Sequence, residues 1–592
     1  MSTSTVNAAA GAEPAVFVEW VEAAFDRDGP IARAHPGFTA RDGQRRMAIA
    51  VAEAIEHGAA LVAEAGTGTG KTFAYLVPAL LCGGRVLIST GTRTLQDQLF
   101  QRDLPGVRDA LGVTPSIALL KGRSNYVCKH HLRRNLEEGR FERREDAALL
   151  RRIDRFAAVS ASGDRSAAPG IPEDSPVWSK ATSTRENCLG QDCPELAGCF
   201  VFRARQAAQH ADVVVVNHHL FFADLALRDE GISELLPSVD AVIFDEAHQL
   251  PEIAVQFFGR SVSTRQLGDF ARDLFRIGMA DAADAADWTG INAELEQALR
   301  VWRLAAGRKG RRDAPQLRAD RGQRDALQTL RDLLERIDDV LLSAAQRSRD
   351  LARLVVRAGE LHGRLANWLS LLDAGARAAS EGKPRPDAAG GEAQAPTPDE
   401  AVLWGEVHQA GVTLHATPLS VAPVMRRHRE AARQAWVFVS ATLSVAGDFS
   451  HFVEAIGIAD ARTLTVDSPF DYATRARLLV PRGCGDPSSD GYAQRVAALC
   501  WPLLEANRGR AFVLCTSLRM VDLLGTLLRE RAAAQHEPME LLVQGSAARG
   551  ELLDRFRSAR QPVLIGSASF WEGVDVVGDQ LSLVIIDKLP FA

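Results

Sequence analysis

The chain has 592 residues, 46% of them hydrophobic and 24% charged, which is enough for about three or four domains with buried cores. No apolar run approaches the length of a membrane span, and the N-terminus lacks a charged segment followed by an apolar one, so we expect a cytoplasmic protein without a membrane partner. The formal net charge of −6 gives no global sign of nucleic-acid binding, so any such partner must meet a local basic surface.

A loop rich in glycine and threonine follows an apolar run at residues 59–63 and precedes a helical pattern at residues 73–81. A strand, a loop and a helix in this order are the context that a phosphate-binding loop requires. The loop consists of Ala65, Gly66, Thr67, Gly68, Thr69, Gly70, Lys71 and Thr72. Its small residues let backbone N–H groups surround phosphate oxygens, while Lys71 offers a cation and the Thr72 hydroxyl can ligate Mg²⁺. An ordinary turn is the alternative, which the Lys-Thr ending disfavours.

Four of the eight cysteines lie between Lys121 and Phe202: Cys128, Cys188, Cys193 and Cys199. The last three are spaced C-x4-C-x5-C, and residues 129–187 separate them from the first. Four thiolates suit either structural zinc or an iron–sulfur cluster, and these wide spacings favour the cluster over the paired knuckles of a zinc site. Disulfides are rare in cytosolic chains. We therefore expect the remaining four cysteines to be lone buried thiols, namely Cys82, Cys484, Cys500 and Cys515.

Six short apolar runs each end in a polar signature. The runs are residues 86–88, 213–216, 242–244, 437–439, 512–514 and 563–565. Separated by helical patterns, they predict buried strands of parallel sheets, whose ligands gather outside the carboxyl ends of the strands. Six such endings indicate one shared site.

The acidic signature Asp245-Glu246-Ala247-His248 follows one of these runs. An aspartate at a strand end can hold Mg²⁺, and the adjacent Glu246 can polarise the water that attacks a γ-phosphate. A helix N-cap is the alternative for Asp245. The phosphate-binding loop earlier in the chain favours the catalytic interpretation.

From Leu330 to Leu372, apolar residues recur three or four positions apart, which predicts one long amphipathic helical segment. Most of its arginines are expected on a solvated face. Residues 374–400, rich in Ala, Gly, Pro and Glu, predict a flexible loop.

Two further features leave alternatives open. His218 and His219 could be metal ligands, but no third ligand at suitable spacing accompanies them, which disfavours a metal site. Trp571 either stacks on a base or packs in a core.

Together, five segments resemble superfamily 2 DNA helicases of the XPD/DinG group, and most closely the bacterial YoaA-type branch. The segments are AGTGTGKT at 65–72, STGTRTLQDQL at 89–99, DEAH at 245–248, SATLS at 440–444 and GSASFWEGVDVVG at 566–578. The resemblance implies an α/β fold with two RecA-like lobes, ATP between them and single-stranded DNA across their tops. It assigns adenine recognition to Gln44, and nucleotide or DNA coupling to residues 89–96, 440–442 and 567–575, including Gly573 and Asp575.

The same resemblance implies a 4Fe–4S cluster on Cys128, Cys188, Cys193 and Cys199, in an insertion between STGTRT and DEAH. It also implies a helical Arch domain that encloses DNA. The expected domains are residues 15–120, 206–262 and 410–470 for the first lobe, 121–205 for the cluster domain, 263–409 for the Arch, and 471–592 for the second lobe.

The expected activity is ATP- and Mg²⁺-dependent 5′ to 3′ movement along single-stranded or tailed duplex DNA, by a monomer that meets replication or repair proteins. Family members carry a Gln-x-x-Gly-Arg segment after the last motif, and no such segment follows Asp575, so a truncated, poorly hydrolysing second lobe is expected. A DNA-binding or remodelling protein without strand separation is therefore the alternative. A nuclease is a weaker one, because about forty residues precede Gln44, too few for an exonuclease domain.

Overall fold

The computed structural model describes residues 14–35, 37–139, 144–172, 175–185, 187–229, 235–381, 401–409, 411–533, 539–547, 549–567, 570–571, 574, 576 and 578–589. Its contacts divide the chain into two compact units, Met1–Asp164 with Ser179–Pro469, and Arg165–Trp178 with Phe470–Ala592. In the described part, no helix combines the length and the apolar character needed to cross a membrane.

The first unit is built on a seven-stranded sheet in the order β11-β1-β10-β5-β2-β4-β3, in which every neighbouring pair is parallel. The strands are β1 (Ala60–Ala65), β2 (Val86–Thr90), β3 (Ile117–Leu119), β4 (Val213–Asn217), β5 (Ala241–Asp245), β10 (Ala435–Ser440) and β11 (Arg462–Val466). The four apolar runs that were predicted as strands in this part of the chain all form buried central strands. The sheet therefore has the parallel α/β character that the sequence predicts.

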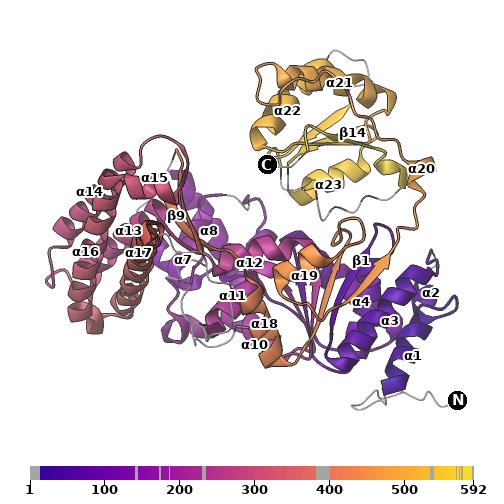
Figure 1. The fold of residues 1–592 in the computed structure, drawn as a ribbon, viewed down its shortest axis with the longest axis horizontal. Coiled ribbons are helices and arrows are strands. Elements are labelled where there is room, and N and C mark those ends of the chain that lie inside the picture. Colours follow the sequence, from indigo (N-terminus) through magenta and orange to yellow (C-terminus); the bar gives the residue numbers. More distant parts are fainter. Residues whose placement is uncertain are drawn as a thin grey trace. The chain divides into compact units, whose positions relative to one another are not determined.

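Helices cover both faces of this sheet (Figure 1). One face packs against α1 (Pro14–Ala24), α3 (Asp42–His57), α4 (Lys71–Leu81) and α6 (Leu104–Leu111); the other packs against α11 (His218–Asp229), α12 (Leu250–Phe258), α18 (Ala422–Ala432) and α19 (Ser450–Ile456). Because side chains alternate along a strand, Leu61 and Ala63 enter the first core while Val62 enters the second. Both faces of the sheet are buried. The strands are therefore continuous runs of apolar residues in the sequence, and apolar residues do not alternate with polar ones.

The cysteine region, residues 121–205, joins β3 to β4 through short elements. They are α7 (Lys129–Glu138), α8 (Arg144–Val159), α9 (Trp178–Ala181) and α10 (Phe200–His210), with single turns at Arg123–Asn125, Gly190–Asp192 and Leu196–Gly198. This region contains no strand longer than a single bridge among its described residues. Its conformation therefore depends on side-chain and loop contacts.

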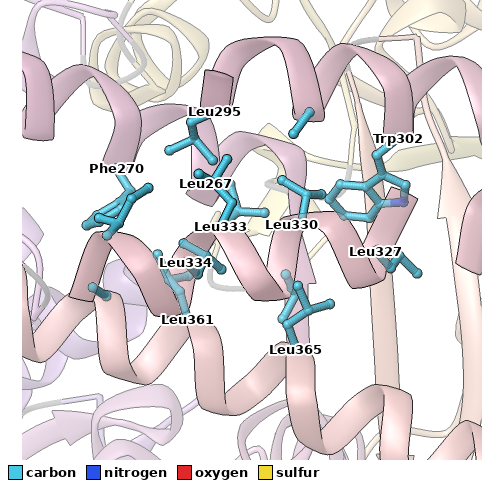
Figure 2. Packing of buried hydrophobic residues seen from close by; sticks show 14 of the residues in the cluster. Leu267, Phe270, Leu295, Trp302, Leu327, Leu330, Leu333, Leu334, Leu361 and Leu365 are labelled. Atoms are coloured by element: carbon cyan, nitrogen blue, oxygen red, sulfur yellow. The ribbon is translucent and has the colours of Figure 1, made fainter. Parts of the chain in front are cut away.

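A helical insertion lies between β5 and β10. It consists of α13 (Thr264–Asp281), α14 (Trp288–Ala305), α15 (Ala314–Ala319), α16 (Arg321–Ala344) and α17 (Arg349–Glu381). Figure 2 shows leucines of α16 and α17 pointing toward Phe270 of α13 and Trp302 of α14. The apolar positions predicted between Leu330 and Leu372 are buried in this core, apart from the half-buried Val355. The helical periodicity thus identified the core face correctly.

Three details of the insertion differ from the prediction. The expected single segment is two helices, because the chain breaks at Ala345–Arg347 and Ser348 accepts a hydrogen bond from the Leu351 N–H, a cap that starts α17. Residues 374–381 belong to α17 rather than to a loop, and residues 382–400 lie outside the described part.

The third difference is a four-stranded antiparallel sheet, in the order β6-β9-β8-β7, that the sequence analysis missed. Its strands are β6 (Arg260–Ser263), β7 (Gly310–Asp313), β8 (Ala401–Val407) and β9 (Val412–Pro418). In β9, Val412, Leu414 and Ala416 are buried while the residues between them are partly exposed. This alternation is a strand signal, present in the sequence and overlooked.

Charged side chains join the cysteine region to the helical insertion. Arg134 on α7 pairs with Asp350 at the start of α17, and Arg276 on α13 binds Glu138 at 3.0 Å. Arg353 donates to the backbone carbonyl of Arg185 at 2.6 Å. These contacts hold the two insertions of the first unit against each other.

The second unit has a four-stranded parallel sheet in the order β13-β14-β12-β15. Its strands are β12 (Ala511–Leu514), β13 (Glu540–Val543), β14 (Pro562–Gly566) and β15 (Leu583–Ile586), and its main helices are α21 (Tyr492–Ala506), α22 (Leu518–Ala532) and α23 (Arg549–Ser558). Cys500 and Cys515 are buried as expected, whereas Cys82 in the first unit and Cys484 are only half-buried, which corrects the prediction for these two. The two parallel sheets match the predicted fold class.

Candidate active site

The predicted phosphate-binding loop runs from the end of β1 to the first turn of α4. Gly68 and Gly70 have φ angles of 83° and 81°, in the left-handed region that glycine tolerates best. A β-carbon at Gly70 would also clash with the side-chain amide of Gln44. Glycine is therefore required at position 70 for both conformational and steric reasons.

Neighbouring segments fix the loop through its backbone carbonyls. Thr69 Oγ1 donates to the Gly66 carbonyl at 2.9 Å, and Gln44 Nε2 donates to the Gly70 carbonyl at 2.9 Å. Ser468 Oγ, which follows β11, donates to the Thr67 carbonyl at 2.7 Å. These bonds hold the loop in place, and the first N–H groups of α4, which have no acceptor within the helix, are the donors that an anion can use.

The chain places the predicted catalytic carboxylates at the carboxyl end of β5, on the same sheet edge as the loop. Asp245 is buried, and Tyr75 on α4 donates a hydrogen bond to its Oδ2 at 3.1 Å. Burial, and then the charge of Glu246, raise the pKa of Asp245 to about 7, against the opposing influence of the Lys71 cation. Tyr75 lies one helical turn after Lys71 on α4, so its bond to Asp245 brings the start of this helix and the end of β5 to one site.

Glu246 adopts a left-handed backbone conformation, with φ of 55°, at the start of the turn Ala247–Gln249. Its carboxylate accepts a hydrogen bond from Ser440 Oγ at 3.4 Å and lies 3.5 Å from His248 Nδ1. His248 Nδ1 is also 2.9 Å from Ser440 Oγ. Glu246, His248 and Ser440 thus form a polar cluster that links β5 to the neighbouring strand β10.

Three supporting residues were missed by the sequence analysis. Glu64, just before the loop, accepts hydrogen bonds from the Leu443 N–H at 2.5 Å and the Ser444 N–H at 2.6 Å. Tyr75 bonds Asp245, and Ser468 bonds the loop. Of the three, only Glu64 could have been recognised in the sequence, because an acidic residue inside an otherwise apolar strand needs a partner. The partners themselves are remote in sequence.

His218 and Ser89 form a second buried pair, with 2.7 Å between His218 Nδ1 and Ser89 Oγ. Burial lowers the pKa of His218 to about 3, so the imidazole is neutral at physiological pH. The side chains of Ser89, Gln96 and Ser440 are fully buried. They can transmit a change through the sheet, whereas direct contact with DNA requires the exposed residues of these segments, such as Arg93.

Comparison with known proteins places the chain in a family. Family models match residues 45–114 as a DEAD/DEAH box helicase, residues 182–267 as DEAD_2 and residues 500–592 as a helicase C-terminal domain. The ATP-dependent DNA helicase YoaA of Escherichia coli (strain K12) is 42% identical over 96% of this chain and 85% of that protein. The chain belongs to the YoaA/DinG family of ATP-dependent DNA helicases.

Two further relatives agree with this assignment. The ATP-dependent DNA helicase YoaA of Haemophilus influenzae (strain ATCC 51907 / DSM 11121 / KW20 / Rd) is 39% identical over 96% of this chain and 84% of that protein. The ATP-dependent helicase DinG of Mycobacterium tuberculosis (strain ATCC 25618 / H37Rv) is 34% identical over 95% of this chain and 83% of that protein. The resemblance to YoaA/DinG helicases that the motifs predicted is thus confirmed.

In this YoaA/DinG-family chain three of the four candidate cluster ligands lie at the ends of short elements, and Cys188 lies in a loop. Cys128 precedes α7, Cys193 follows the turn Gly190–Asp192, and Cys199 precedes α10. All four thiols, including Cys188, are free and half-buried. Burial, with smaller contributions from the other three cysteines, raises the pKa of Cys128 to about 11.

The described side chains do not form a site for a single metal ion. Among the residues that the structure describes, no group of three or more His, Cys, Asp or Glu side chains is placed to hold a single metal ion. Cys128 and Cys193 each lie near enough to other cysteines of this set for the thiol charges to raise their pKa values.

The last helicase motif is only partly described. Gly573 and Asp575, which were predicted to bind nucleotide, lie outside the described residues. Trp571 packs against the small apolar cluster under β12 and β14, together with Phe570. Of the two alternatives for Trp571, the described contacts favour packing.

Proposed function

We propose that this chain moves 5′ to 3′ along single-stranded DNA and separates duplex DNA at the expense of ATP. The observation that carries the proposal is the hydrogen bond from Tyr75 to Asp245, which joins the helix that begins with Lys71 to the strand end that carries Asp245 and Glu246, in a YoaA/DinG-family chain. This site combines an anion-binding helix N-terminus with two acidic side chains, as phosphoryl transfer to water requires.

Each side chain has one role in the proposed reaction. Lys71 and the N–H groups of residues 65–72 hold the outer phosphates, and Gln44 meets the adenine. Thr72 and Asp245 would hold Mg²⁺, which when bound neutralises charge on the β- and γ-phosphates. Glu246 accepts the proton of the attacking water.

The polar cluster of Glu246, His248 and Ser440 supports a coupling role. Ser440 is the last residue of β10 and the first of the SATLS segment, and its hydroxyl contacts the proposed general base directly. A shift of this segment when DNA binds would change the hydrogen bonds of Glu246. We propose that this contact makes hydrolysis respond to DNA.

We also propose a 4Fe–4S cluster held by Cys128, Cys188, Cys193 and Cys199. When bound, such a cluster cross-links four points of a region whose described part has little regular structure of its own. The chain contributes the thiolates, and burial around Cys128 keeps solvent from one side of the site.

The proposed domains keep the boundaries expected from the sequence. The first lobe comprises residues 15–120, 206–262 and 410–470, the cluster domain 121–205, the Arch 263–409 and the second lobe 471–592. We propose a cytoplasmic monomer that acts on tailed duplex DNA with replication or repair proteins.

A helicase assay with two substitutions tests the function. Lys71→Ala should reduce DNA-stimulated ATP hydrolysis by at least roughly a hundredfold, because a cation on the transferred phosphate is lost. Glu246→Gln should keep ATP binding and lose hydrolysis. Lys309→Ala and Glu252→Gln, two exposed positions with the same changes of charge, are the matched controls.

The substrate distinguishes the proposal from its alternative. A duplex with a 5′ single-stranded tail should be unwound by the parent protein and the controls, and a duplex with a 3′ tail should not. ATP-dependent DNA binding without strand separation on either substrate would favour the remodelling protein. Hydrolysis at the parent rate in both site variants would refute the assignment of the active site.

A further inference from the structure

The side chain of Lys121 is an ammonium group held inside the protein between two carboxylates. Its Nζ lies 2.6 Å from Asp97 Oδ1 and 2.6 Å from Asp164 Oδ2, and only 2% of the side chain is exposed. A charge removed from water to this degree is tolerated only when partners replace the lost hydration. Asp97 and Asp164 are 27% and 13% exposed, so Lys121 is the most deeply buried member of the triad.

The triad connects two parts of the molecule with different proposed roles. Asp97 lies on α5 (Arg93–Gln98), the helix that follows β2 within the STGTRTLQDQL segment. Lys121 is the first residue of the cysteine region after β3, and Asp164 lies further along the same region. The buried cation therefore connects α5 both to the segment that follows β3 and to the cysteine region around Asp164. We call this set of contacts the junction.

Other bonds strengthen the same junction. Gln96 Nε2, next to Asp97, donates to the Leu120 carbonyl at 2.9 Å, so two successive side chains of α5 hold the residues at which the chain leaves the sheet. The Lys121 N–H donates to Tyr126 Oη at 3.0 Å, and Tyr126 forms an antiparallel bridge with Asp164.

The first cluster ligand continues directly from this junction. The Val127 N–H donates to the Gly163 carbonyl at 2.9 Å, and the Cys128 N–H donates to the Ala181 carbonyl at 2.7 Å. The bonds of Lys121 and the backbone bonds of Val127 and Cys128 thus form one continuous set of contacts. These contacts connect elements far apart in sequence, which is the requirement for mechanical coupling.

We propose that Lys121 is a positioning residue that makes α5 and the cysteine region move as one body. The inference rests on the proposed helicase function, because its consequence is that movement of the DNA-facing α5 during ATP hydrolysis reaches the region that separates the strands. Without the cation, Asp97 and Asp164 lose the partner that they share, and the contact that joins α5 to the cysteine region through Lys121 is lost.

Lys121→Met is the central test, because it keeps the length of the side chain and removes the charge. Amide hydrogen exchange at Val127 and Cys128 should accelerate by roughly tenfold or more, since their acceptors lie across the junction. ATP hydrolysis without DNA should stay within about twofold of the parent rate, while the number of base pairs unwound per ATP should fall by roughly tenfold. Lys121→Arg, which keeps the charge, should retain most of both properties.

Two further variants keep the outcome interpretable. Lys180→Met removes a cation of the same region whose partner Asp146, at 3.4 Å, lies on α8 rather than on α5, so it should leave unwinding per ATP unchanged. Asp97→Asn leaves the cation one carboxylate and should give an intermediate acceleration of exchange if Lys121→Met fails to fold.

The readouts separate the two proposals. A parent protein that unwinds no DNA would contradict the proposed function, whereas the hydrogen-exchange comparison would still decide whether Lys121 closes the junction. Unchanged exchange at Val127 and Cys128 in Lys121→Met, or accelerated exchange with parental unwinding per ATP, would overturn the coupling role.

Discussion

Replacing Tyr75 by phenylalanine tests the electrostatic balance at the proposed magnesium site. Tyr75 donates its phenolic hydrogen to Asp245 Oδ2, and this bond favours the ionised carboxylate. Burial raises the pKa of Tyr75 well above 10, so the phenol stays protonated and able to donate throughout the usual assay range. Tyr75→Phe removes the donor while keeping the ring in the core.

The expected size of the effect follows from one lost hydrogen bond to a charged group. Such a bond contributes roughly 1.5–3 kcal/mol, which corresponds to about one to two pKa units. The pKa of Asp245, already raised to about 7, should therefore rise further in the variant. Because Mg²⁺ competes with the proton, the apparent Mg²⁺ affinity of the variant should be weaker by roughly tenfold to a hundredfold near pH 6, and nearly equal to that of the parent near pH 10.

The assay is DNA-stimulated ATP hydrolysis at saturating ATP, with free Mg²⁺ varied at each pH. Tyr492→Phe is the matched control: the Tyr492 hydroxyl donates to the Asp587 carbonyl in the second unit, and its loss should leave the Mg²⁺ dependence unchanged. The titration of ATP itself affects the parent, the control and the variant equally, so it cancels in the ratio of their Mg²⁺ affinities. A ratio of variant to parent affinity that does not change with pH, or no difference at any pH, would refute this account of Asp245.

Three further outcomes are expected. Glu64→Gln should lower the free energy of unfolding, measured with denaturant, by roughly 1.5–3 kcal/mol. The amide cannot accept all three hydrogen bonds that the carboxylate accepts from the Leu443 N–H, the Ser444 N–H and the Ser444 hydroxyl. An unchanged free energy of unfolding would mean that these bonds are not formed in solution. Anaerobically purified protein should be brown with about four irons per chain, and Cys188→Ser should lose iron while keeping DNA-independent ATP hydrolysis; one zinc and no iron would contradict the cluster. Leu334→Ala should destabilise the helical insertion by roughly 2–5 kcal/mol in thermal or denaturant unfolding, whereas Leu342→Ala, an exposed leucine of the same helix, should change stability little.

The sequence by itself determined the features that are written in consecutive residues. The phosphate-binding loop and the acidic turn at Asp245 are local motifs, and the runs before them become strands because nearly continuous apolar residues can be buried on both faces of a parallel sheet. The core positions between Leu330 and Leu372 were recognisable for the same reason, because helical periodicity needs only neighbours along the chain.

Tertiary structure alone decided which remote side chains complete these motifs. Tyr75 reaches Asp245, Glu64 binds the segment after β10, and Lys121 meets both Asp97 and Asp164. None of these pairs has a characteristic spacing, since the distance along the chain between two partners depends on the order in which the strands enter the sheet. A buried charge shows in the sequence only as a charged residue, and its partner is fixed by the packing that brings the two together.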